Sequence, residues 1–388
     1  MIFQSQLRIP GPTPIPDRVV RAAAAPMVDH RGPEFKAVVG EVTEGVKKVF
    51  GTENDLLIYT ASGSGGLESA VVNLISPGDK VIAGVSGNFG DRFAAIAEAY
   101  GADTVRLNSE WGEPITPEDL RATLEANPTT KVVLLTQNET STGLANPLAE
   151  LARVVHDAGA LLAVDGVSSV GSMPIDVDRN QIDVAVTGSQ KGFMSPPGIA
   201  FVTVSGRAWE ANRSARAPRS YFDWGPTAKA VKEGATPYTP AIAVLYAVRE
   251  GLRLLFEEGL ENVYRRHRLL AGGTADALEA MGFRLFAAEG YRSPVVTAAI
   301  PPQGVAPDAY RKLLRERYGV VIGGGQGKMA GKMVRVGHLA AVAEGDMVQV
   351  LWAMEQALEE LDIAPNEGRG VRALSAHLRD RAGEVAAV

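Results

Sequence analysis

Short apolar runs alternate with amphipathic stretches between about residues 50 and 205 of this chain. A short run of β-branched and aliphatic residues is typical of a buried strand, and the amphipathic stretches have the period of a helix. Strands that alternate with helices predict βαβ units and a mainly parallel sheet. This half of the chain is therefore expected to form a doubly wound α/β layer. The expected strands are Leu56–Thr60, Lys80–Ala83, Thr104–Leu107, Lys131–Thr136, Ala160–Asp165, Asp183–Thr187 and Ile199–Val204.

The pattern changes in the second half of the chain. A proline-rich stretch, Thr236–Pro240, leads into two long helical patterns at about 241–257 and 261–281. Residues 283–361 then follow the order strand, helix, strand, strand, helix, which suits a smaller α+β domain. The proline-rich start, Pro10–Pro16, cannot hold a regular helix and is expected to run as an extended arm over the surface. The expected division is an N-terminal arm (1–20), a large domain (21–260), a small domain (261–364) and a tail of unknown role (365–388).

Composition excludes several classes of protein. The 388 residues suffice for about two or three domains. The net charge of −6 is not gathered into runs, which argues against nucleic-acid binding. The chain has no apolar run of the roughly 20 residues that a membrane helix needs, and no secretory signal at its start, so a cytoplasmic protein is expected. Because the chain has no cysteine, it cannot build disulfides, cysteine-ligated metal sites or a cysteine nucleophile. The expected partners are small molecules or another copy of the chain.

A glycine-rich turn, Ser62-Gly63-Ser64-Gly65-Gly66, follows an expected strand and leads into a helix expected to begin near Leu67. Such a turn offers free backbone N–H groups and the positive end of a helix dipole to an anion, and phosphate is the natural ligand. A flexible turn without a ligand is the alternative. The turn lacks both the P-loop ending and the spacing of a dinucleotide fingerprint, which makes a nucleotide the weaker hypothesis.

Two ionisable residues lie at or just after the carboxyl ends of two expected strands. Asp165 follows the apolar run 160–164, and Lys191 follows the strand that ends at Thr187. A buried carboxylate needs a cationic or donating partner, and a lysine at the carboxyl end of a strand is well placed to act as an amine nucleophile. A helix cap and a surface lysine are the structural alternatives. Since ligands of α/β proteins bind at the carboxyl ends of strands, the turn, the carboxylate and the amine are expected at one edge of the sheet.

Arg335 lies in an expected strand of the small domain, in Met333–Gly337. An alternating strand can direct one arginine into a cleft between domains, where its planar guanidinium would hold a carboxylate with two hydrogen bonds. A salt bridge at the rim is the alternative.

Taken in order, these residues resemble the class V aminotransferases of fold type I, and most closely the alanine/serine-glyoxylate (serine-pyruvate) group. The resemblance extends to about residue 361. The segments that carry it are Pro10–Thr13, Val28–Arg31, the glycine turn with Leu67-Glu68, Ser76–Asp79, Asn88–Gly90, Glu139–Gly143, Val164-Asp165, Gly188–Lys191, Pro196–Gly198, Tyr246 and Arg249-Glu250.

The resemblance implies pyridoxal 5'-phosphate as cofactor and gives each residue a role. Lys191 would form the Schiff base and act as general base, and Asp165 would hold the pyridine N–H. Arg335 would bind the substrate carboxylate. Phe89 would stack on the cofactor ring, and Thr140 would contact the phenolic oxygen. The phosphate would be bound by Ser62, Gly63, Ser64 and Gln190, and by Thr239 from the neighbouring subunit of a homodimer. The chain departs from some relatives at Thr236, where they have a tyrosine, and at Ser64, where they have a histidine.

The expected reaction moves an amino group from alanine or serine to glyoxylate or pyruvate with ping-pong kinetics. Phosphoserine or another class V transamination is the alternative. Cysteine desulfuration and kynurenine cleavage are disfavoured, because the chain has no cysteine and has Gln190 where those enzymes place a histidine. A non-catalytic subunit of a larger complex and a nicotinamide-dependent oxidoreductase are the weaker hypotheses.

Overall fold

The computed structural model describes residues 5–363 and 367–380. Its larger sheet has seven strands in the order β2-β10-β9-β8-β5-β3-β4, and β10 runs antiparallel to both of its neighbours. The other neighbouring pairs are parallel, so the expected α/β layer and its seven strands are confirmed. The strands are β2 (Asp55–Tyr59), β3 (Lys80–Val85), β4 (Asp103–Asn108), β5 (Val132–Thr136), β8 (Leu161–Asp165), β9 (Val184–Gly188) and β10 (Ala200–Val204).

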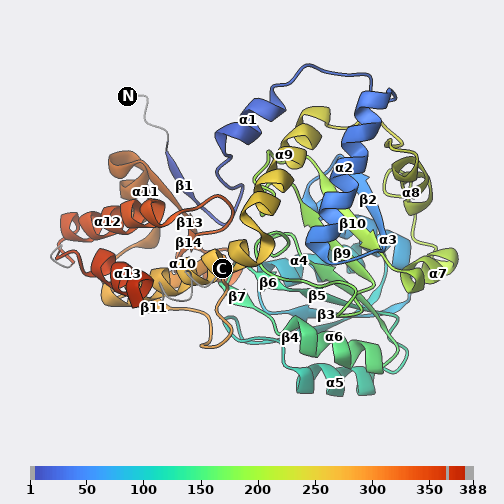
Figure 1. Ribbon diagram of the computed structural model, residues 1–388. Coiled ribbons are helices and arrows are strands. Elements are labelled where there is room, and N and C mark those ends of the chain that lie inside the picture. The colour runs from blue at the N-terminus through green and yellow to red at the C-terminus, as the bar shows by residue number, and fades with distance from the viewer. Residues whose placement is uncertain (1–4, 364–366, 381–388) are drawn as a thin grey trace.

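Both faces of this sheet are buried, and alternate residues of a strand belong to different cores. In β2, Leu56 and Ile58 belong to one core. Leu57 and Tyr59 belong to the other. Because helices cover both faces, each strand can be apolar along its whole length, which made the strands recognisable in the sequence. Figure 1 shows helices around this sheet in the larger lobe. The first core includes α2 (Pro33–Phe50), α5 (Pro117–Ala126), α6 (Leu148–Asp157) and α9 (Ile242–Glu258), and the second includes α3 (Gly63–Leu74), α4 (Asn88–Ala99), α7 (Gly206–Ser214) and α8 (Trp224–Lys232).

Helix α3 begins at Gly63, earlier than the start expected near Leu67. Ser62 is its N-cap residue, and the Ser62 carbonyl accepts hydrogen bonds from Gly65 N (2.9 Å) and Gly66 N (3.2 Å). A Cβ on Gly66 would lie 2.5 Å from Val186 Cγ1 in β9. The glycine therefore lets the first turn of the helix lie against the sheet, so a run of glycines that suggested a loop serves close packing instead.

The second sheet has five strands in the order β1-β13-β14-β12-β11 and lies in the smaller lobe (Figure 1). The long helices expected at 241–257 and 261–281 are confirmed as α9 and α10. The expected order for 283–361 is also found, with one two-residue strand added. The boundaries of the domains stay a prediction. The elements of this lobe are β1 (Gln6–Arg8), α10 (Leu260–Ala280), β11 (Arg284–Leu285), β12 (Val296–Ile300), α11 (Pro307–Tyr318), β13 (Val320–Gly324), η1 (Gly327–Met329), β14 (Val334–Gly337), α12 (Glu344–Glu360) and α13 (Arg369–Asp380).

The N-terminal segment has no helix between Pro10 and Pro16, as expected, but it does not lie wholly on the surface. Strand β1 pairs in parallel with β13. Pro10 and Thr13 are buried, and Thr13 N donates to the Gln190 carbonyl at 3.1 Å. The surface arm was therefore wrong for these residues, because backbone pairing with the distant β13 draws the segment inward. A short helix, α1 (Asp17–Ala23), follows.

The tail, to which the sequence assigns no role, contains the helix α13, which packs against α10. Leu374 is fully buried, and His377 Nδ1 lies 2.7 Å from Asp276 Oδ2. A Cβ on Gly273 of α10 would lie 2.5 Å from Leu374 Cδ1, so this glycine allows the two helices to approach closely. Residues 364–366 and the end of the tail, residues 381–388, lie outside the described residues.

Candidate active site

One cavity of about 310 Å³ lies at the carboxyl ends of the strands of the larger sheet. It contains every residue to which the sequence assigned a role except Thr239 and Arg335. Most of the lining residues follow β2, β3, β5, β8 and β9, since parallel strands bring their carboxyl ends to one edge. The full lining is Gly11, Ser62, Gly63, Ser64, Leu67, Phe89, Arg92, Asn138, Thr140, Asp165, Val167, Ser168, Gln190, Lys191 and Gln326.

Lys191 follows β9, and its Nζ donates a 2.6 Å hydrogen bond to the Pro10 carbonyl. Burial and, to a smaller extent, the charge of Arg335 lower the pKa of the Lys191 amine to about 8, and Asp165 opposes the shift. An amine with this pKa is partly neutral near physiological pH, whereas an exposed lysine is almost wholly protonated. Lys191 is thus suited to act as a nucleophile or a base.

Asp165 ends β8, and its side chain is 5% exposed. Its Oδ1 accepts a hydrogen bond from Val167 N at 2.9 Å. Burial is the main cause that raises the pKa of Asp165 to about 6, and the Val167 N–H opposes it. The ionised form of a buried carboxylate is stabilised by a cationic or N–H-bearing ligand beside it.

The glycine turn lies at the wall of the same cavity. The backbone N–H groups of Gly63 and Ser64 donate to no acceptor within residues 5–363 and 367–380, and they lie at the N-terminus of α3. The Ser64 hydroxyl accepts a long, 3.4 Å hydrogen bond from Arg92 Nη1. Free N–H groups, hydroxyls and a nearby guanidinium together make a cradle for an anion.

Phe89 and Thr140 line the cavity from the start of α4 and from the hairpin after β5. Phe89 is the second residue of α4, and the guanidinium carbon of Arg92 lies 5.0 Å from the centroid of its ring. Thr140 follows β6 (Asn138–Glu139), which pairs with β7 (Leu144–Ala145) in a small hairpin.

Arg335 lies beside the cavity, but it does not form part of the wall. Its side chain is 6% exposed, with hydrogen bonds from Nε to the Gly324 carbonyl (2.7 Å) and from Nη1 to the Thr140 carbonyl (2.8 Å). Burial lowers its pKa to about 10 and Glu139 opposes the shift, so the guanidinium stays charged at neutral pH. A carbonyl of β13 in the smaller sheet and a carbonyl of the hairpin in the larger lobe therefore fix this cation.

Thr239 is exposed and does not line the cavity. Its neighbour Tyr238 stacks on Tyr221 with ring centroids 4.9 Å apart, and Thr236 Oγ1 donates to the Tyr238 carbonyl at 2.7 Å. The contribution of Thr239 to a neighbouring subunit's site stays a prediction.

Sequence reasoning missed several residues of the wall, namely Gly11, Leu67, Arg92, Asn138, Val167, Ser168 and Gln326. A signal for Arg92 existed, because it follows Phe89 by three positions in a helix and so shares its face. Gly11 and Gln326 carried no such signal. They reach the wall from the N-terminal segment and from the loop after β13, which are remote in sequence from the other wall residues.

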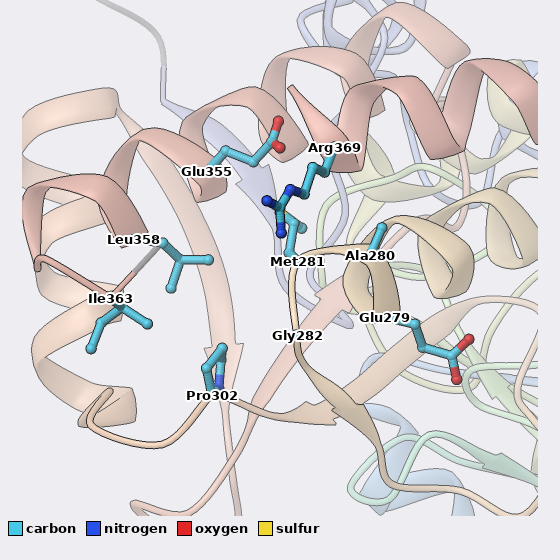
Figure 2. A pocket seen from close by; sticks show the side chains of 9 residues that line it. All are labelled: Glu279, Ala280, Met281, Gly282, Pro302, Glu355, Leu358, Ile363 and Arg369. Carbon is cyan, nitrogen blue, oxygen red and sulfur yellow. The ribbon is translucent and has the colours of Figure 1, made fainter. Parts of the chain in front are cut away.

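A second cavity lies in the smaller lobe, between α10, α12 and the start of α13 (Figure 2). Glu355 lines it and is 5% exposed, and its Oε1 accepts a hydrogen bond from Gly370 N at 2.9 Å. This carboxylate therefore stabilises the N-terminus of α13. Among the described residues, the cavity is lined by no lysine or hydroxyl nucleophile, and it lies apart from the strand ends that carry Asp165 and Lys191.

None of the helices in residues 5–363 and 367–380 combines the length and apolarity needed to cross a membrane.

The residues at the strand ends fit pyridoxal 5'-phosphate. The anion cradle suits a phosphate, the carboxylate of Asp165 suits a pyridine N–H, and the amine of Lys191 suits an aldehyde. Gln190 Oε1 and Asn138 Oδ1 are buried at this cavity without a hydrogen-bond partner in the described part of the chain, as expected for a site that takes a polar ligand.

Comparison with known proteins agrees with this chemistry. The family model for the class V aminotransferases matches residues 10–343. The chain is 39% identical over 376 residues to the soluble hydrogenase small subunit of a Synechococcus species, covering 96% of this chain and 98% of that one. It is 39% identical over 388 residues to the serine–glyoxylate aminotransferase of Methylorubrum extorquens, covering 97% and 96%. The solved structure of the ureidoglycine–glyoxylate aminotransferase of Bacillus subtilis matches with a TM-score of 0.92 at 30% identity, covering 98% and 99%. The chain therefore belongs to the class V aminotransferases and is a transaminase of fold type I that depends on pyridoxal 5'-phosphate.

Proposed function

We propose that this enzyme transfers an amino group from a small amino acid, alanine or serine, to a small 2-oxo acid, glyoxylate or pyruvate, with ping-pong kinetics. The observation that carries the proposal is the partly buried Lys191 amine, which shares one cavity with Asp165 and the anion cradle. Relatives named for glyoxylate transamination support the choice of acceptor. In this scheme the first oxo acid leaves before the second binds.

Lys191 and Asp165 would handle the protons of the reaction. The bound cofactor supplies an electron-withdrawing ring. Lys191 is the attachment point for the cofactor's aldehyde carbon, and the freed amine then takes the proton from the substrate Cα. Its lowered pKa suits a group that must accept and return a proton near neutral pH. Asp165 holds a proton at the ring nitrogen.

The other residues of the cavity would bind and orient. Ser62, Gly63, Ser64 and Gln190 hold the phosphate, Phe89 stacks on the ring, and Thr140 contacts the phenolic oxygen. The free N–H groups of the cradle and the buried, unpartnered Gln190 Oε1 support these assignments.

Arg335 would bind the substrate carboxylate. Its charge lowers the pKa of Lys191, and the carbonyl that its Nη1 binds belongs to Thr140, which lines the same cavity as Lys191. Its Nη2 donates to no acceptor in the described part of the chain, whereas Nε and Nη1 fix the plane of the guanidinium. A fixed planar donor is well suited to a carboxylate.

The proposal includes a cytoplasmic homodimer in which Thr239 completes the neighbouring phosphate site. The support is an exposed apolar surface near Thr239, since Tyr238 is 46% exposed and the stacked Tyr221 is 40% exposed. Exposed aromatic side chains of this kind are enriched at protein interfaces. Light scattering would give the oligomeric state, and a Thr239→Val variant with normal cofactor affinity would contradict the shared site.

The function is tested with the purified holoenzyme. Borohydride should fix the cofactor to the peptide that contains Lys191, and Lys191→Ala should lose turnover. Initial rates against both substrates should give parallel double-reciprocal lines. Alanine, serine and phosphoserine are assayed side by side with glyoxylate and pyruvate, and faster turnover of phosphoserine would select the alternative. Normal turnover by Lys191→Ala would refute the mechanism.

A further inference from the structure

Glu139 is a fully buried carboxylate to which the proposed function gives no role. Its exposed fraction is 0%, and burial raises its pKa. No lysine or arginine in the described ranges forms an ion pair with it. Burying a carboxylate costs several kcal/mol unless hydrogen bonds compensate it, so the groups around Glu139 show what it stabilises.

The compensating donors come from the start of α4 and from Ser141. Glu139 Oε2 accepts hydrogen bonds from Phe89 N at 2.9 Å and Gly90 N at 3.0 Å. Its Oε1 accepts from Ser141 N at 3.1 Å and Ser141 Oγ at 2.5 Å, and Ser141 Oγ accepts from Asn88 N at 2.9 Å. The first three N–H groups of α4 are therefore bound by this pair of side chains, which replaces a local N-cap.

The Glu139 side chain lies close enough to the start of α4 to constrain the residue before the helix, Gly87. A Cβ on Gly87 would lie 2.5 Å from both Cγ and Cδ of Glu139. Glycine at this position leaves room for the Glu139 side chain to reach the backbone of α4. The carboxylate and the start of the helix are thus held in one arrangement.

The residue after Glu139 extends the connection to the small sheet. Thr140 lines the cavity, and its carbonyl accepts the hydrogen bond from Arg335 Nη1. The charge of Glu139 also favours the charged form of Arg335 and raises the pKa of Asp165. One short hairpin therefore links the start of α4, the cavity and the arginine.

We propose that Glu139 is a positioning residue whose carboxylate fixes the first turn of α4 and thereby holds the ring of Phe89 against the cofactor. The inference depends on the proposed stacking role of Phe89. Glu139 does not touch the reacting atoms. It acts through the two N–H groups at the start of the helix and through the peptide that it shares with Thr140.

The test is Glu139→Gln in the holoenzyme. A glutamine keeps the shape but has one acceptor oxygen, so its NH2 group must face either the Phe89 and Gly90 N–H groups or Ser141. We expect the visible circular dichroism of the bound cofactor to change and the dissociation constant of the cofactor to rise about tenfold, the size expected for losing one charge-assisted hydrogen bond. Loss of the negative charge should also move the acidic limb of the pH profile of cofactor binding to lower pH, since Glu139 raises the pKa of Asp165.

Asp183→Asn is the matched control. Asp183 is 2% exposed, burial raises its pKa, and it accepts hydrogen bonds from Leu162 N and Ser205 Oγ. It precedes β9, at the edge of the sheet opposite Lys191. Asp183→Asn should lose stability while its cofactor keeps the normal dichroism and affinity. If Glu139→Gln behaves in the same way, with affinity within twofold of the wild type, Glu139 is a structural carboxylate only and the inference is overturned.

Two further variants separate the inference from the function on which it depends. Phe89→Leu should change the dichroism if Phe89 stacks on the ring. If the dichroism changes in Phe89→Leu but not in Glu139→Gln, the inference alone is overturned. If the dichroism changes in Glu139→Gln but not in Phe89→Leu, the stacking role of Phe89 is overturned as well. If Glu139→Gln does not fold, Ser141→Ala removes one donor to Glu139 and the acceptor of Asn88, and it should give a smaller change of the same sign. An unchanged dichroism in Ser141→Ala would then overturn the inference.

Discussion

Lys191 Nζ donates its hydrogen bond to the carbonyl of Pro10, a residue 181 positions earlier in the chain. Thr13 N binds the Gln190 carbonyl on one side of this contact, and β1 pairs with β13 on the other. Gly11 lies between them, where a Cβ would be 2.3 Å from Lys191 Nζ. The N-terminal segment is therefore part of the wall against which the reactive lysine packs.

Gly11→Ala should displace the lysine. Gly11 has a φ of +129° and no room for a Cβ, so the substitution strains the backbone and pushes on Lys191. We expect turnover to fall about tenfold or more, because small displacements of a reacting group are costly. Borohydride trapping followed by mass spectrometry should show less cofactor on Lys191. Gly78→Ala is the control, since Gly78 has a φ of +87° but open space around it. Equal trapping in both variants would mean that Gly11 does not constrain the lysine.

Capture of the cofactor by the apoprotein should depend on pH through Lys191. The neutral amine attacks the aldehyde, and burial holds the pKa of Lys191 at about 8. The rate should therefore rise roughly tenfold per pH unit below that value and level off above it, as the neutral fraction does. Stopped-flow absorbance measures the rate. In Arg335→Met the midpoint should move to higher pH, because Arg335 lowers the pKa of Lys191. A midpoint near that of an exposed lysine in the wild type would contradict the buried amine.

The sequence could predict the parts of the fold and site that depend on local pattern. The strands of the larger sheet are buried on both faces, so each one is a continuous apolar run with a clear end. Asp165 and Lys191 could be placed together because parallel strands end at the same edge, and β8 and β9 are indeed neighbours. The antiparallel direction of β10 had no local signal.

Contacts between segments that are distant in sequence could not be predicted. The inward course of Pro10 depends on the pairing of β1 with β13, which no local period encodes. The start of α3 at Gly63 was missed because the glycines that usually mark a loop serve here to let the helix touch Val186. The guanidinium of Arg335 is held by the carbonyls of Gly324 and Thr140, which only the folded chain brings together.

Arg92→Ala should weaken binding of the cofactor through its phosphate. The cradle is built from neutral groups, and Arg92 is a cation of the wall that hydrogen-bonds Ser64 and has no carboxylate partner in the described residues. Losing a hydrogen bond to a charged group costs about 1.5–3 kcal/mol, so we expect the dissociation constant of pyridoxal 5'-phosphate to rise about ten- to hundredfold. Binding of pyridoxal, which has no phosphate, should change little. Arg213→Ala is the surface control, with 77% of its side chain exposed. If the affinities for pyridoxal 5'-phosphate and for pyridoxal fall equally, Arg92 acts through its contact with the ring of Phe89 and not through the phosphate.

Gly66→Ala should lower both the stability of the fold and the affinity for the cofactor. The new methyl group would lie 2.5 Å from Val186 Cγ1, which forces α3 away from the sheet. Overpacking of this kind costs about 1–3 kcal/mol in the free energy of unfolding. Because the same helix presents the N–H groups of Gly63 and Ser64, its displacement should also raise the dissociation constant of the cofactor. Urea denaturation and cofactor titration measure the two effects.

The clash with Val186 can be isolated by a double-mutant cycle. Val186→Ala removes the atoms that the new methyl group would meet, so Gly66→Ala should cost at least about 1 kcal/mol less in that background than in the wild type. Gly206→Ala is the matched glycine control, since it is also in the first turn of a helix but has nothing within 4 Å of its Cβ position. It should be neutral or stabilise the fold by up to about 1 kcal/mol. Additive costs in the cycle would show that Gly66 is needed for the conformation of its own turn, and that the contact between α3 and β9 does not set the position of the cradle.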